Sequence, residues 1–219
     1  MGRTAFLGTV IIGLGLAACG SDDPGALPVA IHPTKLFSGF DDGSVTFKVP
    51  ATLANGGKNV KWVVADGNLA SVETEPGDAS HAIVTTKKPG KTTLRATAGG
   101  TTYEVPLTIT QYAVGARDIG NDLYQEDRAS GPGVEPGGAA GTKALGCISC
   151  HGAGGTARHS PSEIGGFDDA DILKCIATAE RPGGKGLANM GNHKYVLDDK
   201  EKEAIMARLR SLEPVEFPQ

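Results

Sequence analysis

The residues best able to do chemistry in this chain form the run Cys147-Ile148-Ser149-Cys150-His151. Two thiols separated by two residues occur in redox dithiols and in zinc sites, and with a histidine directly after the second thiol they form the attachment motif of a c-type haem. In that third case Cys147 and Cys150 would bond covalently to one edge of the haem, and the His151 imidazole would bind the iron. The compartment decides among the three, because exported and cytoplasmic proteins use thiols differently.

The beginning of the chain predicts export. Arg3 precedes an apolar run over residues 5–18, which is shorter than the roughly 20 residues of a membrane-spanning helix. A positive charge, a short apolar run and small residues before a cleavage site are the layout of a secretory signal peptide. We therefore expect residues 1–18 to be removed and the mature protein to work outside the cytoplasm.

The end of this leader, Leu16-Ala17-Ala18-Cys19, resembles the lipobox of bacterial lipoproteins. The resemblance implies cleavage before Cys19 and lipidation of that residue. At about 0.8 kcal/mol per buried methylene, several acyl chains hold a protein on a membrane where a single chain is marginal. Residues 19–26 are then a lipidated tether. Because Gly20 rather than aspartate follows Cys19, the resemblance implies the outer membrane rather than the inner one.

Export limits what the other cysteines can do. Cys147, Cys150 and Cys175 are an odd number, which excludes a pure disulfide framework. A zinc site would need a further ligand, which Cys175 or His159 could supply. A thioredoxin-like dithiol would need a βαβ unit, and the sequence pattern predicts none. We therefore expect one covalently bound haem c. The net charge of −4, with no basic run, argues against a nucleic-acid partner.

Residues 27–111 predict an all-β sandwich. Segments rich in threonine and valine alternate between apolar and polar side chains, as half-buried strands do. Leu94, Ala96 and Ala98 fall on one face, and Trp62 sits inside a strand, where we expect it to be part of the core. Turn signals such as Asp66-Gly67 separate the strands at the spacing of a sandwich.

Two stretches of this half resemble the bacterial Ig-like (group 2) domains. They are VKWVVADGNLASVE, over residues 60–73, and KPGKTTLRATAGGTTYEVPLTIT, over residues 88–110. The resemblance implies an Ig-like sandwich. Such a fold serves as a spacer, an adhesion module or a docking surface, and the fold alone does not choose among these.

Helical periodicity replaces the strand pattern after Tyr112. Helices are predicted over residues 114–125, 168–179 and 197–214, with Asp168 and Asp198 as N-caps. Residues 125–143 are rich in glycine and proline and predict a surface loop. We therefore expect a second, all-α domain over residues 112–219.

Residues 113–213 resemble the class I cytochromes c. The resemblance rests on Gly120 and Tyr124 in the first helix, on the cysteine motif, on Met190 in a loop and on the start of the last helix at residue 197. It implies a multidomain chain, with the Ig-like sandwich followed by an all-α class I cytochrome c fold.

The same resemblance implies Met190 as the distal iron ligand opposite His151. His193 is the alternative distal ligand, because a small shift of the same loop would present it. The backbone carbonyl of Pro161 is expected to accept the ring N–H of His151. Cys175 has no role in the family pattern and is expected to pack as a small apolar side chain.

The function predicted from these features is one-electron transfer by a membrane-anchored monohaem cytochrome, with redox proteins as partners and no enzymatic activity. Two protein ligands on the iron leave no position for a substrate. Two alternatives stay open. One is a haem enzyme or a gas or peroxide sensor with a labile sixth ligand. The other is an Ig-like docking or adhesion lipoprotein with an accessory haem.

Overall fold

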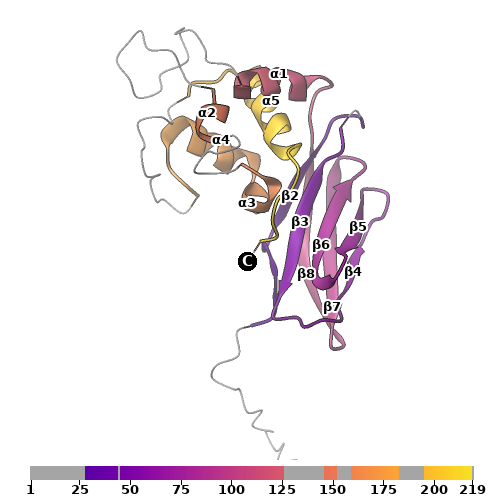
Figure 1. Cartoon of the computed structure of the whole chain (residues 1–219). Helices are drawn as coiled ribbons and strands as arrows, with labels where there is room; N and C mark the ends of the chain where they lie inside the picture. Colours follow the sequence, from indigo (N-terminus) through magenta and orange to yellow (C-terminus); the bar gives the residue numbers. More distant parts are fainter. Residues whose placement is uncertain (1–27, 44, 126–145, 152–158, 183–194, 219) are drawn as a thin grey trace, which may run out of the picture.

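The structure is a computed structural model that describes residues 28–43, 45–125, 146–151, 159–182 and 195–218. Within these residues eight strands come first and five helices follow. The strands form a two-sheet sandwich, and the helices gather on one side of it, next to β2 and β3 (Figure 1).

The sandwich consists of two four-stranded sheets. The first has the order β1 (Ala30–His32), β3 (Lys48–Ala54), β6 (Asp78–Thr86), β5 (Ala70–Glu75). The second has the order β2 (Leu36–Phe40), β8 (Thr101–Gln111), β7 (Gly90–Ala98), β4 (Lys61–Val64). All neighbouring strands are antiparallel except β2 and β8, which are parallel.

The core of the sandwich lies between the two sheets and follows the predicted alternation. Leu94, Ala96 and Ala98 of β7 all point inward and are buried. Trp62 of β4 is also buried, and its indole N–H donates to the carbonyl of Ala79 at 2.9 Å, so the one polar group of this side chain is satisfied. The predicted all-β sandwich over residues 27–111 is therefore confirmed.

The stretch 60–73 divides between the two sheets. β4 belongs to the second sheet and β5 to the first, so the chain crosses the sandwich between Val64 and Ala70. Asp66 lies in the connection between the two sheets. Its carboxylate accepts the backbone N–H of Asn68 at 2.9 Å, which closes a tight turn.

The helices are α1 (Ala116–Gln125), α2 (Ile148–His151), α3 (Pro161–Ile164), α4 (Asp169–Thr178) and α5 (Asp199–Arg210). Both predicted N-caps are present: Asp168 accepts the backbone N–H of Asp171, and Asp198 that of Glu201, each at 2.8 Å. Among the described residues, none of the helices has the length and apolar character needed to cross a membrane.

The predicted fold class was wrong in its second half. The described chain is mainly β-sheet with a few short helices, the longest of them 12 residues, and no large all-α class I cytochrome c domain follows the sandwich. The helices do not enclose a core of their own, because Phe47 and Tyr112 of the sandwich are fully enclosed members of the helical core cluster. Helical periodicity reports an apolar face but not its partner, so the sequence pattern did not show that sheet residues complete this core.

Two of the helices cross at very short range. Gly120 of α1 faces the backbone of α5, and a Cβ atom at this position would overlap the carbonyl oxygen of Ala204. Tyr124 and Ile205 are buried beside the crossing. Met206 is 1% exposed and packs in the same cluster.

Candidate functional site

The cysteine motif forms one helical turn. The backbone N–H of His151 donates to the carbonyl of Cys147 at 2.9 Å, and Cys150 and His151 both belong to α2. The Cys147 side chain is partly buried and packs against the helical core cluster. The side chains of Ser149 and Cys150 lie outside what the structure describes.

Aromatic rings surround the imidazole of His151. The ring of His159 stacks on it, with 3.5 Å between centroids and 23° between planes. Tyr124 meets His159 edge-on at 6.1 Å, and its hydroxyl donates to the backbone carbonyl of His151 at 3.4 Å. The hydrogen bond from Tyr124 to the His151 carbonyl therefore holds the motif against α1.

The environment of Tyr124 shows how enclosed this region is. Its side chain is 4% exposed. Burial raises the pKa of Tyr124 to about 12, with a smaller contribution from negative charge on the neighbouring Cys147, while the positive charge of Arg208 acts in the opposite direction. An ionised group beside the motif is therefore costly unless it is paired.

The donor set of this turn fits a covalently attached haem. Cys147 and Cys150 supply two thiols on one turn, His151 supplies an imidazole next to them, and the apolar cluster behind Cys147 is the surrounding that a porphyrin requires. Among the described residues, no group of three histidine, cysteine or acidic side chains is placed to hold a metal ion.

The other predicted site residues are placed as follows. Met190 and His193 lie outside the described residues, and so does Cys19. Pro161 is buried at the start of α3, and its carbonyl accepts the N–H of Gly165 at 2.9 Å. Cys175 is partly exposed on α4, and burial raises the pKa of its thiol.

Sequence reasoning missed the most heavily bonded side chain, Arg210 at the end of α5. It is 1% exposed and forms an ion pair with Asp169 of α4, with Nη2 and Oδ1 2.9 Å apart. Its remaining donors reach the backbone carbonyls of Ile164 at 2.9 Å, of Phe37 at 3.4 Å and of Phe167. The one signal in the sequence was that Arg210 lies on the face of its helix that carries apolar, core-facing residues.

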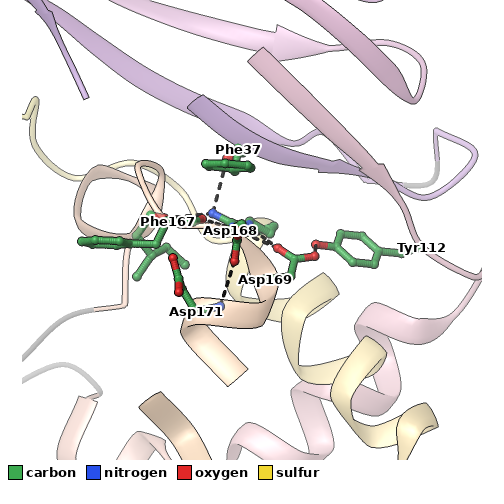
Figure 2. A network of polar contacts seen from close by, with 8 residues as sticks. Phe37, Tyr112, Phe167, Asp168, Asp169 and Asp171 are labelled. Atoms are coloured by element: carbon green, nitrogen blue, oxygen red, sulfur yellow. Dashed lines mark hydrogen bonds and ion pairs between the residues drawn. The ribbon is translucent and has the colours of Figure 1, made fainter. Parts of the chain in front are cut away.

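This network, the Arg210 network, joins the helices to the sandwich (Figure 2). The hydroxyl of Tyr112, directly after β8, donates to Asp169 Oδ2 at 2.7 Å, so that carboxylate binds one residue from each part. The backbone N–H of Phe37 on β2 donates to the carbonyl of Gly165 at 2.8 Å. Strand β2 is an edge strand of its sheet, and these bonds occupy backbone groups that an open edge would expose.

The C-terminal segment contacts both the sandwich and the helices. Lys48 of β3 forms an ion pair with Glu213 at 3.0 Å, and Ser162 bonds to the backbone of Glu216. The ring of Phe217 stacks on His81 of β6, with 4.4 Å between centroids. Sandwich and helices are therefore held by contacts from both ends of the helical part.

The chain matches no protein-family model, and no curated protein is significantly similar to it. Among solved structures, domains 4 and 5 of the S-layer protein SbsC align at 20% identity and a TM-score of 0.30, over 38% of this chain and 51% of that one. The Ig-like domain of human Obscurin-like protein 1 aligns at 16% identity and a TM-score of 0.26, over 42% of this chain and 93% of the domain. Likenesses this weak carry no argument about activity.

Proposed function

We propose that this protein is an exported, lipid-anchored surface protein whose Ig-like sandwich carries a haem-bearing helical part for one-electron transfer. The observation that carries the proposal is the motif itself: Cys147, Cys150 and His151 follow one another on one helical turn, and Cys147 packs against an apolar cluster. The lipoprotein-like leader ending at Cys19 supports it, because c-type attachment belongs to exported proteins and prevents loss of the cofactor by dissociation.

Each residue has one role in this proposal. The thiols of Cys147 and Cys150 would hold the haem covalently, the His151 imidazole would bind the iron, and Met190, or His193 as its alternative, would supply the second protein ligand. When bound, the haem supplies a centre that gains and loses one electron. The rest of the chain excludes water and holds the motif still. Tyr124 supports the turn through the His151 carbonyl, and the Arg210 network keeps the helices on the sandwich.

Reversible redox behaviour of the purified holoprotein tests this function. We expect ferric and ferrous spectra that interconvert in a titration fitted by a single one-electron step. Addition of carbon monoxide to the ferrous protein should leave the spectrum unchanged, because two protein ligands would leave no free position on the iron. A rapid spectral change with carbon monoxide would contradict electron transfer at a six-coordinate iron and favour the enzyme or sensor alternative.

A second candidate function is docking or adhesion through the sandwich, with the haem as an accessory. Strand β4 favours it, because it is an edge of its sheet and exposes Val63 at 43%. Such an edge can accept a strand from a partner. Val63→Lys should weaken cell-surface or partner binding while the haem spectrum is retained. Binding that survives this change and needs the haem instead would argue against the second candidate.

A further inference from the structure

Two arginines lie where α1 and α5 cross, and among the described residues neither forms an ion pair with a carboxylate of another element. Arg117 lies in the first turn of α1, and Arg208 lies near the end of α5. Gly120 allows the close approach of the two helices, since a Cβ at this position would also meet the Cβ of Arg208 at 2.9 Å. The crossing therefore brings two positive charges from distant parts of the sequence together.

Arg208 is the less satisfied of the two. Its guanidinium lies over the ring of Tyr124, with Cζ 5.7 Å from the ring centroid. Its Nε is buried and has no hydrogen-bond partner in the structure, and no ion pair is formed by this side chain within the described residues. Arg210 differs from Arg208, because the N–H groups of Arg210 donate to the Asp169 carboxylate and to backbone carbonyls such as that of Ile164.

Arg117 has only a weak partner. Its Nη1 lies 3.1 Å from Oδ1 of Asp118, the next residue in the chain, whose side chain is 79% exposed. Exposed pairs of this kind add little. The Nε of Arg117 is buried and has no partner in the structure. Arg117 lies one turn before Gly120, the residue that α5 approaches at Arg208, so both arginines lie at the crossing. Burial lowers the pKa of Arg208, and the charge of Arg117 lowers it further.

We propose that Arg117 and Arg208 form a docking site for an acidic segment of a redox protein partner. Two half-buried guanidiniums with like charge are stabilised when a carboxylate lies between them, and the planar guanidinium group matches the two oxygens of a carboxylate. The site lies beside the motif, because Tyr124 contacts Arg208 on one side and the His151 carbonyl on the other. The identification of the partner as a redox protein rests on the proposed function. The preference for an acidic segment does not.

Charge at this position acts mainly on the rate of encounter, since electron-transfer complexes have small interfaces and are steered electrostatically. We choose an acidic protein segment over a membrane because the site is formed by two guanidiniums at one helix crossing rather than by a broad basic surface. The chain as a whole carries a net charge of −4, so these arginines are a local feature of opposite sign.

The test compares small redox probes of opposite charge at low ionic strength. Arg117→Gln with Arg208→Gln should slow oxidation of the ferrous protein by ferricyanide by about five-fold or more. Oxidation by the tris-phenanthroline cobalt(III) cation should not slow. Arg95→Gln is the matched control for each single variant of the site, because Arg95 is paired with Glu104 at 2.7 Å on the sandwich and its loss removes one positive charge elsewhere. Equal slowing by control and site variants would overturn the proposal.

A binding measurement separates the docking site from the haem. Titration calorimetry with hexaglutamate should show Arg208-dependent binding to the full-length chain, whether or not haem is attached. Equal binding of inorganic phosphate would mean a general anion site and would overturn the choice of partner. Arg-dependent binding to anionic vesicles without binding of hexaglutamate would overturn it in favour of a membrane. A colourless protein that still binds hexaglutamate would refute the proposed function but keep the acidic docking site.

Discussion

Arg210 and Asp169 form an ion pair at the boundary between helices and sandwich, with Nη2 and Oδ1 2.9 Å apart and the arginine side chain 1% exposed. Asp169 also accepts the hydroxyl of Tyr112 from the sandwich. A desolvated charge is tolerated only when partners surround it, and here those partners come from α3, α4 and β2. The bonding of one side chain therefore depends on the correct docking of both parts.

Arg210→Met should lower the free energy of unfolding by about 3–5 kcal/mol, because it leaves the Asp169 carboxylate and several buried carbonyls without their donor. Urea denaturation followed by Trp62 fluorescence and by helical circular dichroism measures this. The two probes should give one coincident transition in the unmodified protein. Arg95→Met removes a half-exposed pair with Glu104 and should cost under about 1 kcal/mol. Equal losses in the two variants would contradict the role of the Arg210 network.

Gly120→Ala should separate α1 from α5, because the added Cβ overlaps the backbone carbonyl of Ala204, which cannot rotate away. We expect a loss of about 2–3 kcal/mol, although alanine is the better helix former. Thermal unfolding measures the change. Gly67→Ala is the control, since a Cβ there meets nothing within 4 Å. If Gly120→Ala were neutral, the close crossing of these helices would be wrong.

The stability of the protein should fall in alkaline solution. Burial raises the pKa of Tyr124 from 10.0 in the unfolded chain to about 12 in the folded one, so the unfolded state loses its proton first. The contribution of Tyr124 is therefore fully present below pH 10 and is lost as the pH rises toward 12. Urea midpoints for Tyr124→Phe should fall less over this window than those of the unmodified protein. Parallel curves would show that Tyr124 is not enclosed.

Cys19→Ser should release the protein from membranes, because the lipobox resemblance makes Cys19 the sole acylated residue. Fractionation of cells into soluble and membrane material, with antibody detection, measures this. Cys175→Ser serves as the control and should stay with the membrane. A membrane-bound Cys19→Ser protein would contradict lipid anchoring.

Local features were predictable from the sequence. The alternation that buries Leu94 and Ala96, the core position of Trp62 and the aspartate caps of α4 and α5 all depend on residues close together in the chain. Each is decided by strand period, side-chain size or capping chemistry, which a short window contains.

Long-range features were not predictable in this way. Phe47, directly before β3, belongs to the helical core cluster, and the apolar side chain of Ile119 on α1 is 38% exposed. Arg210 reads as a solvated helix end, yet residues of three other elements surround it. Periodicity measures the angle of a side chain about its own axis and carries no information on which distant element covers it.

The mass of the mature protein, purified from cells that mature c-type cytochromes, tests the central claim most directly. We predict a polypeptide mass increased by one haem, retained after denaturation and solvent extraction, and absent when Cys147 and Cys150 are both replaced by alanine. Cys175→Ala should keep the added mass. A colourless protein whose mass equals that of the lipidated polypeptide alone would contradict the account.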